Sequence, residues 1–160
     1  MWESAIINEY LDETFPEPPL LPKESIQRAQ ARIWINFADT RLFAASGKLL
    51  YTPDPQQQVE GAKELTEHLL FIEHEGLRKM SDDGPYWFGA EISLVDLTYY
   101  PLFEQWAVLA HYRGCQLPTG LDRLKQWWET VANRESVRAI ANSQEFYLER
   151  YGQLAQARKA

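Results

Sequence analysis

The sequence predicts an all-α protein, a bundle of helices packed around one core. Apolar residues recur every three to four positions through most of the 160 residues, and no segment shows the strict alternation of a half-buried strand. Proline and glycine fall between the periodic segments, where helices should end. The chain is 45% hydrophobic and 13% aromatic, which is enough to bury a core rich in aromatic rings.

The first helix is predicted at the N-terminus, over residues 3–14, where four apolar side chains share one face. A proline-rich stretch ends this helix and indicates a linker. We therefore expect the following division of the chain: residues 1–15, the last helix of a preceding domain; 16–23, the linker; 24–152, a helical domain; and 153–160, a polar tail that frays.

Two long helices should follow, over residues 24–46 and 56–80, and the first should end at Gly47 as a C-terminal cap. Because the loop between them is short, we expect them to pack as an antiparallel pair. A fourth helix over residues 94–111 is apolar nearly all round, so it belongs in the centre of the bundle, and Pro101 should kink it.

The remaining helices are shorter. Gly114 should close the central helix, and a fifth helix follows Leu121. Two further short helices are expected near residues 136–141 and 145–151.

A capping box is predicted at the start of the central helix. Ser93 can accept the backbone N–H of Asp96, whose carboxylate can reach back to the N–H of Ser93. Ile92 and Leu97 are spaced as a hydrophobic staple across the same turn. Catalysis by Ser93 or Asp96 is the alternative, but we favour the interpretation as a folding device.

Glu3 and Ser4 open the first helix. A helix N-terminus presents free N–H groups and the positive end of the helix dipole, so it suits an anionic ligand. A serine hydroxyl at this position can bind a carboxylate, although a serine that merely caps the helix gives the same pattern.

These two motifs, in this order and about 90 residues apart, resemble the glutathione S-transferase family. Residues 3–22 are similar to the end of the family's thioredoxin-like domain and its linker, and residues 88–96 to the capping motif of its C-terminal domain. Within the family the pattern looks most like the omega, lambda and related bacterial branches. The resemblance implies that Ser4 binds the α-carboxylate of glutathione and Glu3 its amino group.

The resemblance also implies a reaction, and a catalytic domain that these residues do not include. Family members use a glutathione thiolate to attack an electrophile or a disulfide, so glutathione would be the co-substrate and a small electrophile or disulfide the partner. The thioredoxin-like domain, with the Tyr, Ser or Cys that activates the thiol, would lie ahead of Glu3. We therefore assign no catalytic residue to this sequence, and expect it to supply the apolar substrate wall and one edge of the glutathione site.

Trp34, Phe37 and Arg41 share one face of the second helix and could line the substrate site, with Arg41 steering an acidic substrate. Core packing is the alternative for the two rings, and the one we favour. Two other hypotheses concern the whole chain. It could be a non-catalytic helical module for dimerisation or protein interaction, with a homodimer possible, or a fragment of a complete enzyme.

Other partners are disfavoured by composition. The net charge is −7 without a basic cluster, which argues against nucleic acid and anionic membranes. The single Cys115 excludes an internal disulfide and suits the cytoplasm. We expect no metal, because His68 and His74 are six positions apart and point away from each other on a helix. The acidic residues around His74, Glu73 and Glu75, are interpreted as a solvated face.

Overall fold

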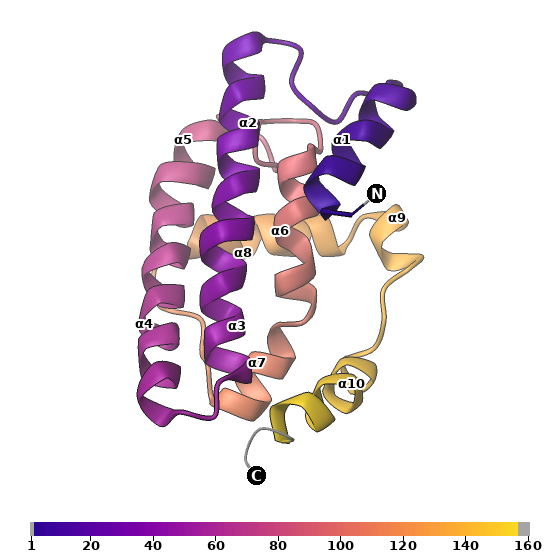
Figure 1. The fold of residues 1–160 in the computed structure, drawn as a ribbon. Helices are drawn as coiled ribbons and strands as arrows, with labels where there is room; N and C mark the ends of the chain where they lie inside the picture. The colour runs from indigo at the N-terminus through magenta and orange to yellow at the C-terminus, as the bar shows by residue number, and fades with distance from the viewer. Residues whose placement is uncertain (1, 157–160) are drawn as a thin grey trace.

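The computed structural model describes residues 2–156, with side chains as far as residue 152. Within this range the protein is built of helices and contains no strand, only an isolated bridge between Tyr86 and Gly89. The all-α prediction is confirmed. Figure 1 shows the helices as a bundle, with the first helix at its edge.

Two long helices form one side of the bundle (Figure 1). The first comprises α2 (Ser25–Phe37), the π-helical segment η1 (Ala38–Leu42) and α3 (Phe43–Tyr51). The second comprises α4 (Pro55–Phe71), the π-helical segment η2 (Ile72–Leu77) and α5 (Arg78–Met80). They run antiparallel, as expected. The pair is close at Gly61, where a Cβ atom would lie 2.8 Å from the backbone nitrogen of Leu49.

The expected end of the first long helix at Gly47 is wrong, since the helix continues to Tyr51. Gly47 lies inside α3, and the helix ends where Thr52 turns to extended backbone ahead of Pro53. A residue that precedes proline is disfavoured in the helical region, so the stop comes from Pro53 rather than from glycine. Arg113 caps this end, because its Nε and Nη2 donate to the carbonyls of Leu49 (3.0 Å) and Leu50 (2.5 Å).

The central helix is interrupted. It was expected as one helix over 94–111 with a kink at Pro101, but it forms α6 (Leu94–Glu104) and α7 (Trp106–Arg113), separated at Gln105. Pro101 has no N–H to bond to the preceding turn, and the chain leaves helical geometry one turn later. Gly114 caps α7 in the left-handed region, with φ of 64°, as the sequence predicted.

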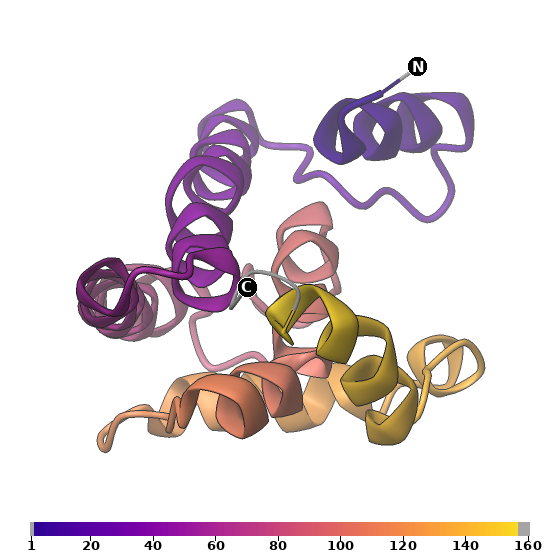
Figure 2. The same ribbon diagram turned by 60° about the horizontal axis from the view of Figure 1, so that its bottom comes forward.

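Three helices complete the bundle: α8 (Asp122–Ala132), α9 (Glu135–Arg138) and α10 (Gln144–Gln156). Figure 2 shows α10 lying across the end of the bundle, and it contacts α7 and α3. Helix α10 includes residues 153–156, which were expected to fray, while residues 157–160 of that predicted tail lie outside the described range.

The core is rich in aromatic rings, as the composition predicted. Trp87 is fully buried, and its ring centroid lies 4.3 Å from that of Tyr99 and 6.2 Å from that of Trp127. Phe103 packs edge-on against Trp127 at 5.3 Å. These rings come from α6, α8 and the loop before α6, so they fix the central helix against the rest of the bundle.

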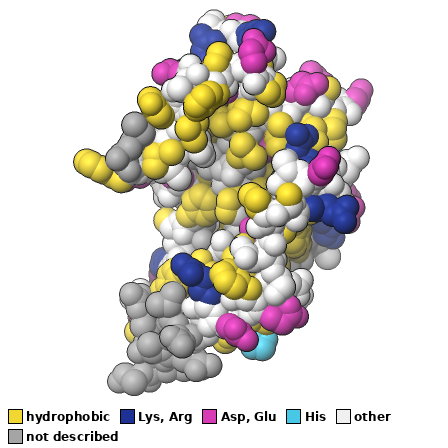
Figure 3. Space-filling model, turned by 90° about the vertical axis from the view of Figure 1, so that its right-hand side faces the viewer, with side chains coloured by type: hydrophobic (Ala, Val, Ile, Leu, Met, Phe, Trp, Pro, Cys, Tyr) yellow, Lys and Arg dark blue, Asp and Glu magenta, His cyan; other side chains and the backbone are white. Residues whose placement is uncertain are grey.

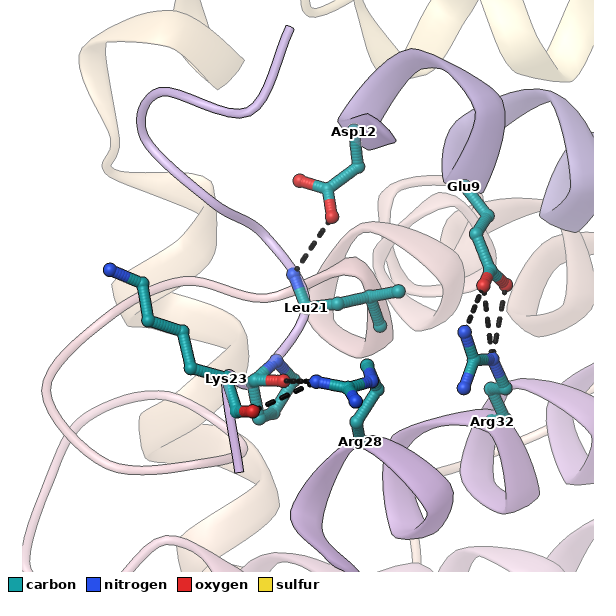
Figure 4. Close-up of polar contacts among 7 residues, drawn as sticks. Glu9, Asp12, Leu21, Lys23, Arg28 and Arg32 are labelled. Atoms are coloured by element: carbon teal, nitrogen blue, oxygen red, sulfur yellow. Dashed lines mark hydrogen bonds and ion pairs between the residues drawn. The ribbon is translucent and has the colours of Figure 1, made fainter. Parts of the chain in front are cut away.

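Helix α1 (Ser4–Thr14) lies at the periphery beside α6 (Figures 1 and 2). Polar contacts hold α1 against α2 and the linker, and Figure 4 shows several of them. Arg32 of α2 forms an ion pair with Glu9, and the Asp12 carboxylate accepts the backbone N–H groups of Leu20 (2.6 Å) and Leu21 (3.3 Å). The linker is thereby fixed to the helix that carries Glu3 and Ser4.

Candidate functional site

The capping box at the start of α6 is formed, and the Asp96 carboxylate does more than close it. Its Oδ2 accepts the N–H and the hydroxyl of Ser93, each at 2.7 Å. Its Oδ1 accepts the N–H of Trp87 (2.9 Å) and the indole N–H of Trp127 (2.7 Å). One carboxylate thus joins the loop before α6, the first turn of α6 and α8.

This geometry supports the folding interpretation over catalysis. Asp96 is fully buried, and that burial raises the pKa of its carboxyl group although the hydrogen bonds oppose the shift. Each carboxylate oxygen is engaged by protein donors, and Ser93 is also buried. Both side chains are therefore engaged in holding the start of α6.

A second buried carboxylate corrects the sequence interpretation of Glu73. It was expected on a solvated face, but Glu73 in η2 has no exposed surface. It accepts the backbone N–H groups of Arg123 (3.2 Å) and Leu124 (2.7 Å) in the first turn of α8, and pairs with Arg78 at 2.6 Å. Glu73 therefore caps a helix distant in sequence, a role that no local pattern reveals.

Glu3 and Ser4 stand exposed at the open end of α1. Ser4 is the first helical residue rather than the cap, and no side chain caps the helix. Glu3 has φ of 68° and ψ of 107°, a conformation that costs energy for a residue with a Cβ and that occurs most often at functional sites. The helix N-terminus thus presents uncapped N–H groups beside a hydroxyl and a carboxylate, a set that can hold a carboxylate and an ammonium group.

Asp39, an exposed residue of η1, is a further carboxylate whose electrostatics involve Glu3, and no sequence pattern pointed to it. Burial, together with the negative charge of Glu3, raises the pKa of Asp39. Asp39 belongs to η1, so its approach to α1 depends on the packing of the two long helices against α6.

Trp34, Phe37 and Arg41 lie together on one side of the first long helix, but they do not line the cavity described below. Trp34 is buried among the rings of Phe37 and Phe71, with centroids 5.7 and 5.5 Å away. Phe37 packs edge-on against His68 at 5.3 Å. Burial and the nearby charge of Arg41 lower the pKa of His68. Core packing describes Trp34 well, and the substrate role of the three residues stays a prediction.

A cavity of about 240 Å³ opens between α3, the α6–α7 junction and α10, and we call it the α3 pocket. Its walls are mainly apolar and include two tyrosine rings. They contain Phe43, Gly47, Leu50, Tyr51, Pro101, Gln105, Leu109 and Tyr151. Sequence reasoning missed it for two reasons: the helix was expected to end before Leu50, and a π-helical segment shifts the face that follows.

Among residues 2–156, no three His, Cys, Asp or Glu side chains lie close enough together to hold a metal ion. Burial raises the pKa of the Cys115 thiol, which disfavours the reactive thiolate. No helix in the described part of the chain is long and apolar enough to cross a membrane.

Comparison with known proteins places the chain among relatives of one family. Residues 56–129 match the family model described as glutathione S-transferase, C-terminal domain. A probable glutathione S-transferase from Glycine max is 31% identical over 144 residues, which cover 86% of this chain and 60% of the relative. Glutathione S-transferase U22 from Arabidopsis thaliana is 36% identical over 114 residues, covering 69% of the chain and 50% of the relative. The chain thus spans about half to three fifths of these relatives.

Solved structures share the fold. The Tau class glutathione S-transferase from mango, Mangifera indica, superposes with a TM-score of 0.85 at 22% identity, covering 96% of this chain and 71% of that one. A rice glutathione S-transferase in complex with glutathione gives 0.81 at 26% identity, covering 98% and 71%. The omega transferase 3C from Trametes versicolor gives 0.76 at 26% identity, covering 98% and 66%. The Tau class is therefore nearer than the omega, lambda and bacterial branches that the sequence resemblance suggested.

Proposed function

Because the chain belongs to the glutathione S-transferase family, we propose that it supplies the helical half of a glutathione transferase site, with the α3 pocket as its substrate wall. One observation carries this proposal. Asp39, whose pKa is raised by burial and in part by the charge of Glu3, and Phe43, which lines the α3 pocket, are four residues apart on one continuous helix. Residues at this spacing share a helix face, so the polar site at α1 and the apolar pocket adjoin.

Glutathione is the proposed ligand of the polar part. Its γ-glutamyl end carries one carboxylate and one ammonium group. The carboxylate would take the Ser4 hydroxyl and the N-terminal N–H groups of α1, and the ammonium group would lie at Glu3. The charge of Asp39 strengthens the cation site, because a bound ammonium relieves the repulsion between the two carboxylates.

The α3 pocket would hold the apolar body of a small electrophile or disulfide. Its volume of about 240 Å³ and its tyrosine rings suit a compact ring system. We assign activation of the glutathione thiol to a residue outside these 160 positions, since burial raises the pKa of the Cys115 thiol and so disfavours its thiolate. The cytoplasm, where glutathione keeps thiols reduced, is the proposed location.

The test uses the chain joined behind the N-terminal domain of the Glycine max relative, with conjugation of glutathione to an aromatic electrophile as the readout. Ser4→Ala should raise KM for glutathione about tenfold, the value of one charge-assisted hydrogen bond. Gly47→Leu places a side chain in the α3 pocket, so it should raise KM for the electrophile and leave KM for glutathione unchanged. If neither variant changes its own KM, the proposed site is wrong.

We also propose that this chain forms a homodimer, as members of the family often do. Ile26 and Ile33 on α2 and Val59 and Phe71 on α4 are exposed apolar residues that a second copy could cover. Light scattering should then give twice the mass of one chain at micromolar concentration, and Ile33→Glu should lower it. A monomer at all concentrations would remove this proposal.

A further inference from the structure

Gln105 lies at the break between α6 and α7 and lines the α3 pocket. We propose that its side-chain amide determines substrate specificity by binding an uncharged carboxamide or carbonyl group on the ring of the electrophile. The inference rests on the proposed function of the α3 pocket as the substrate wall, and it narrows the class of substrate. That class is a compact aromatic electrophile that carries an uncharged hydrogen-bonding group and no carboxylate.

The helix junction does not need the Gln105 side chain. Its φ of −93° and ψ of 8° lie in the sparsely populated bridge region, where the residue ends α6 and precedes α7. A residue at this position often caps the following helix with its side chain, but Gln105 forms no such bond. The backbone makes the local contacts instead: its N–H donates to the carbonyl of Pro101 (3.3 Å), and its carbonyl accepts the N–H of Val108 (2.9 Å).

The Gln105 amide is unpaired on the pocket wall. The side chain is half-buried, and within residues 2–152 it has no hydrogen-bond partner. The hydroxyl of Ser46, another polar group of this wall, already donates to the carbonyl of Phe43 at 2.9 Å. An amide has two N–H donors and an oxygen acceptor, so it can form two hydrogen bonds with a second amide.

The charges around the pocket exclude a carboxylate as the polar group. Among the described side chains, none that lines the α3 pocket is charged. The charged residues beside it are engaged elsewhere: Lys48 pairs with two glutamates of α4, Glu104 accepts the Tyr147 hydroxyl at 2.8 Å, and Arg113 donates to carbonyls at the end of α3. A carboxylate would lose water there without gaining a cation, whereas an uncharged amide recovers its hydrogen bonds at Gln105.

Apolar walls hold the rest of the substrate. The rings of Phe43, Tyr51 and Tyr151 line the pocket from α3 and α10, and its volume of about 240 Å³ suits one aromatic ring. Figure 3 shows hydrophobic side chains gathered over the upper and middle part of the face that carries α1 and α10. A ring with a single polar substituent therefore matches a pocket in which one amide is unpaired.

Calorimetric titration of the full 160-residue chain tests this inference with three probes: 3,5-dinitrobenzamide, 3,5-dinitrobenzotrifluoride and 3,5-dinitrobenzoate. They share the ring and differ in one group, which is an uncharged amide, an apolar group or a carboxylate. The parent should bind the benzamide at least about tenfold more tightly than the benzoate. Gln105→Met keeps the length of the side chain and removes its amide. It should weaken the benzamide about tenfold, the value of two amide hydrogen bonds, and leave the benzotrifluoride unchanged.

Gln126→Met, on the exposed side of α8, is the matched control and should leave all three affinities unchanged. The inference is overturned if Gln105→Met weakens the benzamide and the benzotrifluoride equally, or if Tyr151→Phe rather than Gln105→Met removes the preference for the amide. Benzoate binding as tight as that of the benzamide, or no binding of any probe at millimolar concentration, would also overturn it. If Gln105→Met does not fold, the preference of the parent for benzamide over benzoate, and its loss in Gly47→Leu, decide.

Two results separate this inference from the proposed function. If Gly47→Leu weakens all three probes but Gln105→Met changes none, the pocket stands and only the role of Gln105 is wrong. In the fusion with the Glycine max domain, 4-chloro-3,5-dinitrobenzamide reacts as the glutathione thiolate forms a C–S bond and chloride leaves with the electron pair of the C–Cl bond. Gln105→Met should raise KM for this substrate about tenfold and leave KM for glutathione unchanged. A fusion that conjugates nothing, while Gln105→Met still weakens the benzamide in the 160-residue chain, would remove the proposed function and keep the ligand class.

Discussion

Replacing Asp96 by alanine tests the most connected contact of the fold. The substitution removes the acceptor of four hydrogen bonds and leaves the N–H groups of Trp87, Ser93 and Trp127 without it. Hydrogen bonds to a charged group contribute about 1.5–3 kcal/mol each. Their sum is offset by several kcal/mol, because alanine no longer requires a carboxylate to be buried. The net loss should be about 3–5 kcal/mol, more than the 1–3 kcal/mol of a local capping box alone.

Urea unfolding followed by far-UV circular dichroism measures this loss directly. Ser93→Ala is the control, because it removes the hydroxyl, which donates to the carboxylate and accepts the N–H of Asp96, but keeps the carboxylate itself; it should cost about 1 kcal/mol. Trp127→Phe removes the indole donor and also shrinks a fully buried ring, so it should cost about 2–3 kcal/mol. An Asp96→Ala variant that unfolds at the urea midpoint of the parent would contradict this role of Asp96. So would a loss of unfolding free energy no larger than that of Ser93→Ala.

Three further predictions concern other contacts. Gly61→Ala should destabilise by about 1–3 kcal/mol, because the new methyl group meets the backbone of α3. Gly47→Ala should stabilise by about 0.5–1 kcal/mol, because its Cβ would make only an ordinary contact, 3.8 Å from the Tyr51 ring; equal urea midpoints for the two variants would contradict the close approach at Gly61. Glu73→Ala should cost about 3–5 kcal/mol by uncapping α8, and an unchanged thermal midpoint would show that the contact is absent. Burial and Arg41 lower the pKa of His68, so the neutral imidazole contributes stability that is present above pH 6.5 and is lost as the pH falls. An NMR titration of His68 should give a midpoint below 6.5, and this midpoint should rise in Arg41→Gln. A midpoint above 6.5 would refute this.

The sequence predicted what local periodicity and local capping determine. Helix α1, the long pair and the box at Ser93 and Asp96 follow from spacing within one or two turns, and the structure contains them. The end of α3 was missed because glycine was weighed above Pro53, although proline acts on the residue before it. The break at Gln105 was placed one turn early, since Pro101 deprives the chain of a hydrogen bond but does not itself leave the helix.

The candidate site was less accessible from sequence. Glu3 and Ser4 were found because their position at a helix start is visible locally. Asp39 and the α3 pocket were missed because they depend on π-helical turns and on the packing of α10, which no short pattern encodes. Glu73 was misjudged for the same reason, as its partners lie about 50 residues away.

We propose that these 160 residues provide a substrate wall and one edge of a glutathione site, and that a residue elsewhere activates the thiol. The most direct test compares initial rates of glutathione conjugation to a general aromatic electrophile, with and without the purified chain, at saturating glutathione. Free glutathione is only a few per cent thiolate at pH 7, so the lack of an activating residue should forfeit about 10²-fold or more. We expect equal rates with and without the chain. A clear chain-dependent rate that disappears in Ser4→Ala would contradict it.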